Sequence, residues 1–313
     1  GINSLKAVTT GDDNVTLGFN AGASITTGTR NIHIGGYGGD DYDTESDNLS
    51  IGRSALGGSV AGGEYNIAIG NYSLDALTSA DNCVAVGYNA GTAITTGGSN
   101  TLVGYTAGAA MVDGDGNVCV GTGAGNDITS GANNVAIGQD ALAQTTTTDA
   151  NIAIGRNALQ LPDTETQNIA IGHLALSGSV AGGEYNIAIG GLTLDALTSG
   201  DGNVAVGYNA GTANLTGNGN VTIGYLAGED LTQGPNVIIG DEAAKNATTA
   251  NSNVFIGPHV ADTGVITGDS SVVIGYQAGQ DMTSSGESVI IGYDAGNDVT
   301  TGTGLTIVGS QDY

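Results

Sequence analysis

The sequence predicts an all-β protein, a parallel β-solenoid of about 18 coils with about 17 residues in each coil. A glycine that follows Val, Ile or Leu recurs at intervals of 16, 17 or 18 residues, and apolar and small residues alternate just before it. The ten-residue word VAVGYNAGTA occurs at 84–93 and again at 204–213. Such repetition is typical of a chain built from stacked identical units. The recurrent glycines are Gly18, Gly35, Gly52, Gly70, Gly87, Gly104, Gly121, Gly138, Gly155, Gly172, Gly190, Gly207, Gly224, Gly240, Gly257, Gly275, Gly292 and Gly309.

The first five positions of each copy, ending at the glycine, are expected to form a β-strand because their period is two. Positions two and four share one face, and the fourth is Val, Ile or Leu in all eighteen copies. That face is therefore predicted to be a dry interior that stacking of the copies buries. The side chains predicted inside are Ile34, Ile69, Ile137, Ile171, Ile189, Ile223 and Ile274.

The remainder of each copy is expected to close the coil. The glycine ends the strand where the next coil approaches closely, and the Ala three residues later predicts a tight inner corner. Segments such as Ala93 to Gly97 (AITTG) predict a shorter second strand with Ile or Leu inward. A helix is disfavoured because every copy carries glycine and many carry Thr.

Asparagine begins fourteen of the copies, Asn14 and Asn236 among them. Stacked Asn side chains can bond along the stack and satisfy polar groups at a corner. We therefore expect a structural asparagine ladder.

The pattern runs from Asn14 to the last residues, and no linker interrupts it. We predict one β-solenoid domain over 1–313, in which residues 1–13 form an N-terminal lead-in. The sequence contains no run of about 18 apolar residues, the length that spans a membrane. We therefore expect no membrane insertion. Five Lys and Arg face 31 Asp and Glu, and the formal charge of −26 repels nucleic acids and anionic membrane surfaces.

The words NIAIGRNAL (151–159), NIAIGHLAL (168–176) and NVAIGQDAL (134–142) resemble the head repeats of YadA-like trimeric autotransporter adhesins. They resemble still more the repeats in tail fibres of tailed bacteriophages, and the resemblance covers nearly the whole chain. It implies a β-solenoid, left-handed in the adhesin heads, that assembles as a homotrimer and contacts the surface of another cell.

The third repeat position also predicts a trimer. It should point away from the coil's own core, yet it is apolar, and a long exposed apolar stripe is expected to pack against identical chains. The predicted subunit contacts are Ala68, Ala136, Ala170 and Ala205, then Phe255 and Ile290.

No catalytic constellation stands out, and we expect no enzyme activity and no cofactor. His33, His173 and His259 occupy different repeat positions and form no ligand set with one another. Residues 113–117 (DGDGN) offer oxygens at alternate positions, as a calcium loop does, and residues 40–48 hold five carboxylates in one loop. We favour solvated acidic loops for both segments, with calcium binding as the alternative. The candidate calcium ligands are Asp113, Asp115 and Asn117 in one segment and Asp40, Asp41 and Asp43 in the other.

Tyrosine recurs just after the strand-ending glycine, where rings in adjacent coils should stack. The amphipathic rings are either structural or a surface that binds glycan. The candidate contact residues are Tyr88, Tyr105, Tyr208, Tyr225, Tyr276 and Tyr293.

The function we favour from the sequence is an extracellular fibre or adhesin shaft for attachment to a host or surface, as in a phage tail fibre. Its partners would be two further copies of itself and a glycan or protein of the host cell surface, and its location the virion tail or a cell surface. The alternatives are a bacterial surface adhesin or extracellular filament subunit and, more remotely, an ice-binding solenoid, suggested by Thr pairs such as Thr95 with Thr96.

Overall fold

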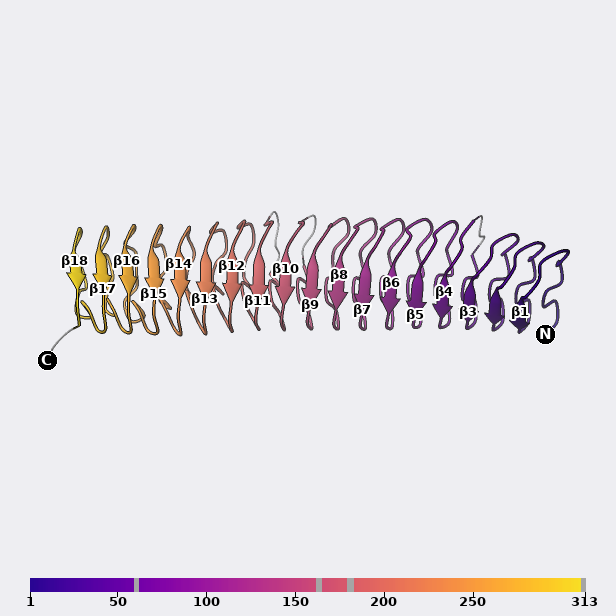
Figure 1. Cartoon of the computed structure of the whole chain (residues 1–313), viewed down its shortest axis with the longest axis horizontal. Coiled ribbons are helices and arrows are strands. Elements are labelled where there is room, and N and C mark those ends of the chain that lie inside the picture. Colours follow the sequence, from indigo (N-terminus) through magenta and orange to yellow (C-terminus); the bar gives the residue numbers. More distant parts are fainter. Residues whose placement is uncertain (59–61, 162–164, 179–182, 311–313) are drawn as a thin grey trace. The chain divides into compact units, whose positions relative to one another are not determined.

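The computed structural model describes residues 1–58, 62–161, 165–178 and 183–310; the segments 59–61, 162–164, 179–182 and 311–313 lie outside the description. It confirms the predicted class, because eighteen parallel strands stack as a β-solenoid, and the described residues contain no helix (Figure 1). Contacts divide the chain into two compact units, Gly1–Thr164 and Glu165–Tyr313. The single domain over 1–313 stays a prediction.

The first unit contains nine strands of three residues. Each pairs in parallel with the next, as Val15 does with Ile32, 17 residues further on. The strands are β1 (Val15–Leu17), β2 (Ile32–Ile34), β3 (Leu49–Ile51), β4 (Ile67–Ile69), β5 (Val84–Val86), β6 (Thr101–Val103), β7 (Val118–Val120), β8 (Val135–Ile137) and β9 (Ile152–Ile154). The lead-in 1–13 consists of turns and bonds to the coil that follows it, as from Thr9 N to Thr26 O at 2.9 Å.

The second unit repeats the arrangement, again with strands that contact only their neighbours in the stack. Its strands are β10 (Ile169–Ile171), β11 (Ile187–Ile189), β12 (Val204–Val206), β13 (Val221–Ile223), β14 (Val237–Ile239), β15 (Val254–Ile256), β16 (Val272–Ile274), β17 (Val289–Ile291) and β18 (Thr306–Val308).

Only positions two to four of each copy form a strand, so the predicted five-residue strand was too long. The second strand predicted over Ala93–Gly97 was wrong, since these residues lie in turns and bends. Ile94, however, points inward as predicted and is fully buried, and so is the corner residue Ala90. The coil therefore closes through turns around an inward apolar side chain.

The assignment of the two strand faces was also wrong. The fourth-position residues Ile34, Ile69, Ile137, Ile171, Ile189, Ile223 and Ile274 all lie on the outer face, and none of them is buried. The third-position residues proposed as subunit contacts lie instead in the chain's own core, each 0% exposed: Ala68, Ala136, Ala170, Ala205, Phe255 and Ile290. The space inside a coil is narrow, so in many coils a small Ala lies on the inner face while Val or Ile lies on the outer face.

The volume inside each coil is shared between the strand and the turn that follows it. One coil combines small Ala68 at the third position with Leu74, four residues beyond the strand-ending glycine, and both are fully buried. Where the strand carries Leu102, the turn has Gly108, whose Cβ would lie 2.8 Å from a Leu102 methyl carbon. Ile238 in the second unit is likewise matched with Ala244 in the same core cluster. In most coils the third position and its partner in the turn therefore vary oppositely in size; Ala85 with Gly91 and Ala205 with Gly211 are small at both.

The strand-ending glycine has one clear physical cause. Gly104 has φ +144°, and a Cβ there would lie 2.2 Å from the carbonyl oxygen of Gly121 in the next coil. Any side chain would both strain the backbone and separate the coils.

The asparagine ladder is present and bonds mainly to backbone. Asn117 Oδ1 accepts a hydrogen bond from the backbone N–H of Asn134 in the next coil at 3.0 Å. Asn134 Nδ2 in turn donates to the carbonyl of Thr148 at 2.7 Å. Each buried Asn thus joins its own coil to the next one.

Because the strand and the turn share the interior volume, a large residue at position 102 and a small one at position 108 should be exchangeable. Leu102→Ala should cost about 2–5 kcal/mol through the cavity it leaves, and Gly108→Leu alone should cost about 1–3 kcal/mol by overpacking. Because Ala68 with Leu74 is a native version of the same pair, the double variant should recover most of both losses. Leu74 shows that this turn position accepts Leu, at φ 49° against 58° for Gly108. Denaturant unfolding followed by circular dichroism checks this, and additive losses would contradict it.

His33 predicts a pH dependence of stability. Its ring takes the third position of β2, Nδ1 lies 2.8 Å from Ser50 Oγ, and burial lowers the pKa of His33 to about 4. The unfolded chain, with an imidazole pKa of about 6.5, therefore binds the proton first. Stability should fall by about 3 kcal/mol as the pH drops from about 6.5 to about 4.

Unfolding measured across this range should show a flatter dependence for His33→Ser, which copies Ser50 in the next coil. His173→Ser, a change at an exposed histidine, is the control and should keep the native slope. Equal slopes for all three proteins would refute the role of His33.

Candidate interaction surfaces

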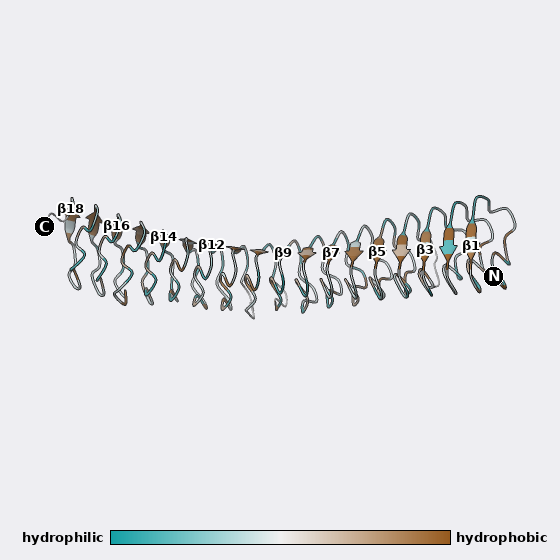
Figure 2. Cartoon of the chain, turned by 90° about the horizontal axis from the view of Figure 1, so that it is seen from below, coloured by the Kyte–Doolittle hydropathy of each residue, from teal (hydrophilic) through white to brown (hydrophobic). Residues whose placement is uncertain are grey.

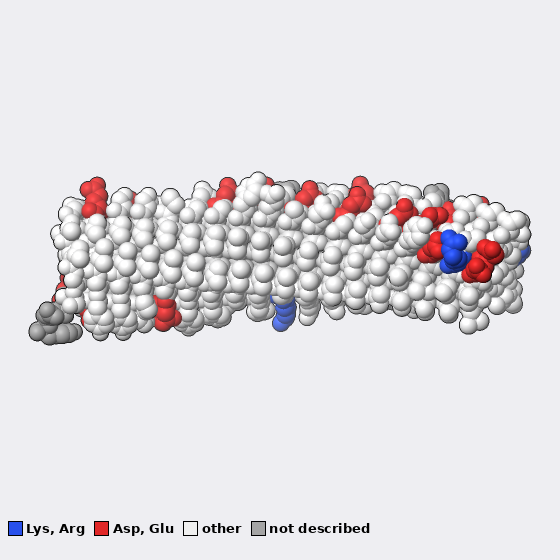
Figure 3. Space-filling view, in the orientation of Figure 1, with Lys and Arg blue, Asp and Glu red and all other residues white. Residues whose placement is uncertain are grey.

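The outer face of the strands is an apolar surface, which we call the sheet face. It consists of repeat positions two and four, the first and last residues of each strand. These positions hold only Val, Ile, Leu and Thr in the described strands. Figure 2 shows most of the strands as the most hydrophobic parts of their coils. Figure 3 shows few charged side chains over the strands of either unit, and most of the visible carboxylates lie toward the margins. The exposed Val, Leu and Ile side chains of the sheet face are Val15, Leu17, Ile32, Ile51, Ile137, Ile189, Val289, Ile291 and Val308.

The predicted tyrosine columns are present and exposed. Tyr88 and Tyr105 stack with ring centroids 5.6 Å apart and planes 10° apart. Tyr208 stacks on Tyr225 at 5.9 Å and 15°, and Tyr276 on Tyr293 at 5.3 Å and 13°. Each of the six rings is 40–58% exposed. Repeat spacing alone predicted these pairs.

In the first unit the column is longer than the sequence indicated. The ring of Tyr72 meets that of Tyr88 edge-on at 6.0 Å, and the guanidinium of Arg53 lies 5.8 Å from the centre of the Tyr72 ring. Tyr72 comes two residues after its glycine instead of one, so the repeat position did not reveal it. We call Arg53, Tyr72, Tyr88 and Tyr105 the aromatic row.

A polar groove adjoins the aromatic row at Tyr105. It has a volume of about 420 Å³ and presents hydroxyl, amide and carboxylate groups from turns of four consecutive coils. Its lining residues are Tyr105, Thr106, Thr122, Gly123, Asn126, Asp127, Asp140, Ala143, Gln144 and Gln160. Sequence reasoning missed this groove because its members occupy different repeat positions. The signal that could have revealed the groove is that these polar residues all follow the strand-ending glycines of consecutive coils.

The two candidate calcium segments do not present convergent carboxylates. Asn117 belongs to the asparagine ladder, where its Nδ2 donates to the Gly131 carbonyl at 2.8 Å. Asp113 and Asp115 are exposed, and Asp115 Oδ1 accepts from the backbone of Gly98 at 2.6 Å. Calcium binding in this segment stays a prediction without a preformed ligand set.

In the other acidic segment, Asp40 is half-buried while Asp41 and Asp43 are exposed. Burial, and then the neighbouring charge of Asp41, raises the pKa of Asp40 to about 6. Asp43 Oδ1 accepts from the hydroxyl of Thr26 in the preceding coil. Among the described residues, the one group of three or more His, Cys, Asp and Glu side chains that converges is Glu242, His259 and Asp262, which lies elsewhere.

The threonine turns form a second ladder. Thr95 Oγ1 donates to the Val112 carbonyl in the next coil at 3.2 Å, and Thr129 Oγ1 to that of Thr146 at 2.9 Å. These hydroxyls therefore join coils. Ice binding by the Thr pairs remains an alternative that nothing in the structure favours.

Comparison of the chain with models of known families, with curated proteins and with solved structures finds no match. In the part of the chain that the structure describes, no helix is long and apolar enough to cross a bilayer.

Proposed function

We propose that this chain forms the shaft of an extracellular attachment fibre, of the kind found in phage tails, and that three copies associate through their sheet faces. The observation that supports this most is the uncovered sheet face itself. Parallel sheets are normally covered on both faces. Here one face covers the coil's own core, whereas the other presents Val and Ile to solvent in coil after coil.

A second copy of the same chain is the partner that fits this face best. The side chains of the sheet face recur at nearly constant spacing, so an identical face matches them along the stack. Three such faces around one axis would close the assembly and leave no face free to add further chains. The proposed subunit contacts are therefore the side chains at the second and fourth repeat positions. The residues predicted from the sequence to make these contacts are buried inside the chain: Ala68, Ala136, Ala170, Ala205, Phe255 and Ile290.

Charge on the sheet face should prevent association. Ile51→Lys combined with Ile137→Lys places two ammonium groups in the proposed interface, at side chains 38% and 37% exposed. We expect sedimentation equilibrium of the native chain to give three times the 30.6 kDa chain mass, and the double variant to give the monomer mass or to fail to fold. Thr147→Lys, at an exposed turn, should leave the trimer intact.

Apolar contact is screened little by salt, whereas the repulsion between chains of formal charge −26 weakens as salt rises. The native trimer should therefore persist at low salt and become more stable at high salt. A native chain that sediments as a stable monomer at both salt concentrations would refute the proposal.

The aromatic row and the polar groove are the best-supported contact site for a glycan of the host surface. Sugars offer apolar C–H faces that pack on aromatic rings and hydroxyls that bond to amides and carboxylates. Tyr105 belongs to both features, and Asp127, Asp140 and Gln144 supply polar groups beside it. The −26 charge favours neutral or cationic glycans over polyanionic ones.

Removal of the shared ring should separate recognition from packing. On an array of immobilised neutral glycans, we expect Tyr105→Ala to lose at least tenfold in affinity, because stacking area and one groove wall disappear together. Tyr225→Ala removes the matching ring of a stacked pair outside this groove and should bind as the native chain does. Equal behaviour of the two variants would assign the tyrosines to packing alone.

Genomic neighbours distinguish the two origins proposed for such a fibre. Tail genes beside the coding gene would support a phage fibre, and secretion genes would support a bacterial surface adhesin.

A further inference from the structure

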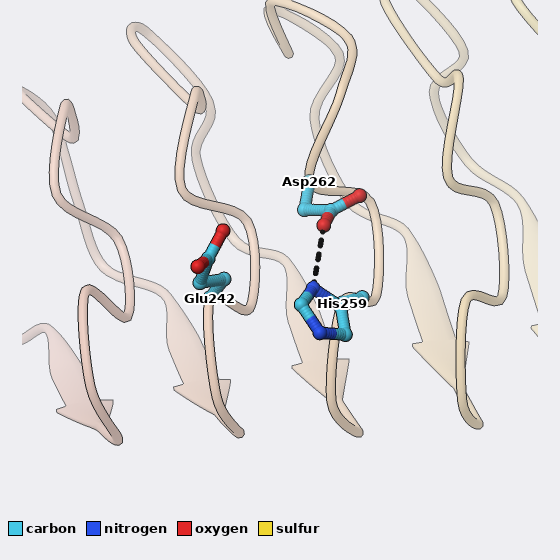
Figure 4. Close-up of side chains that lie close together, drawn as sticks. All are labelled: Glu242, His259 and Asp262. Carbon is cyan, nitrogen blue, oxygen red and sulfur yellow. Dashed lines mark hydrogen bonds and ion pairs between the residues drawn. The ribbon is translucent and has the colours of Figure 1, made fainter.

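The turns that follow β14 and β15 bring three metal-ligating side chains together (Figure 4). Glu242 and His259 both come two residues after their strand-ending glycine, so stacking places them side by side. Asp262 lies one turn beyond His259, and its Oδ2 is 2.9 Å from His259 Nδ1. One ligand atom of each residue lies within 4.8 Å of the others.

The burial of Asp262 distinguishes this group from an ordinary acidic surface. Asp262 is 8% exposed, and its second carboxylate oxygen, Oδ1, is buried without a hydrogen-bond partner among the described residues. A buried carboxylate is costly unless its charge is compensated. The imidazole contacts one of its oxygens, and a cation would compensate the charge directly.

We propose that His259 Nδ1, Asp262 and Glu242 bind one first-row transition-metal dication, with zinc as the type ion. Imidazole nitrogen combined with carboxylate oxygen suits zinc, and two carboxylates neutralise its charge. Bonds of about 2.0–2.2 Å in a tetrahedron put ligand atoms about 3.3–3.6 Å apart. The 2.9 Å pair is already near that spacing, and the flexible Glu242 side chain closes the rest.

The surroundings also fit a bound metal. Asp241 Oδ2 lies 3.9 Å from His259 Nε2, on the side where a ligating imidazole donates its remaining N–H to a carboxylate. The ring of Tyr276, from the next coil, stands edge-on to the imidazole with centroids 6.1 Å apart.

Among the residues that the structure describes, Lys245 is the cation that pairs with Glu242. Its Nζ lies 3.6 Å from Glu242 Oε2 and 3.9 Å from Glu229 Oε2. When Glu242 turns to the metal, the ammonium keeps Glu229 as its partner. Because Glu242 follows β14 while His259 and Asp262 follow β15, the metal would join two adjacent coils of the second unit.

Calorimetric titration of Zn²⁺ into the chelator-treated full chain would measure the affinity and the stoichiometry of binding. The visible absorption of bound Co²⁺ is a second readout. We expect one saturable site per chain and visible Co²⁺ bands of a low-symmetry nitrogen and oxygen site. Ca²⁺ should bind at this site far more weakly, because it prefers all-oxygen ligand sets.

Variants that copy neighbouring coils keep the fold while removing ligands. His259→Gln copies Gln277, which has the same repeat position and a φ of 53°, as His259 has, and should weaken Zn²⁺ binding about 100-fold or more. His173→Gln, at an exposed histidine in a different repeat position, is the matched control and should bind as the native chain does. Lys245→Gln removes the competitor and should tighten binding several-fold.

Three results would overturn the proposal: no saturable Zn²⁺ site in the native chain, equal affinity in His259→Gln and His173→Gln, or a Lys245→Gln variant that binds Zn²⁺ no more tightly than the native chain. Circular dichroism of each variant confirms that a lost site is not a lost fold.

Discussion

The hydrogen bonds of the buried asparagines are the interaction on which the coil stack depends. A strand of three residues offers few ladder bonds, and the turns around it leave backbone groups inside the protein that water cannot reach. The Asn side chain satisfies two of these groups at once, a backbone N–H one coil further on and a carbonyl in the following turn, as Asn100 does with Asn117 and Gly114. Because unsatisfied buried polar groups each cost about 1–3 kcal/mol, the column makes a thin solenoid possible.

Departures from asparagine in this column keep the same bonds in weaker form. The backbone N–H of Cys83 donates to Asn66 Oδ1 at 2.9 Å, and the Cys83 thiol lies 3.4 Å from the Gly97 carbonyl oxygen. Ser271 and Ser288 continue the column with hydroxyls near the end of the second unit. The constraint therefore acts on the donor and acceptor pattern, and a residue is accepted to the extent that it reproduces this pattern.

The repeat made the class, the coil number, the ladder and the tyrosine pairs predictable, because each depends only on which residues recur and at what spacing. The strand faces were not predictable in this way. An alternating pattern of Ala between two Ile is consistent with either face inward. The decision depends on the volume inside the coil, where a small third-position residue such as Ala68 accompanies a large buried residue such as Leu74 in the turn. The inverse sizes of Leu102 and Gly108 were visible in the sequence, but their meaning required knowing that they face each other. The groove beside Tyr105 and the group around His259 combine residues from different repeat positions. Comparison of equivalent positions in successive copies therefore could not reveal them.

Contacts limited to neighbouring coils also affect how such a gene can change. Residues 57–110 largely match residues 177–230, at a distance of 120 residues that corresponds to seven coils, and the two stretches lie in different units. A coil that contacts only the coil before it and the coil after it places the same demands on any neighbour with the same columns. Recombination that inserts or removes whole coils therefore creates junctions that are already compatible, whereas a shift by a fraction of a coil would misalign every column beyond it. Insertion or deletion of whole coils can thus change the length of the solenoid in discrete steps while the packing of its core stays the same.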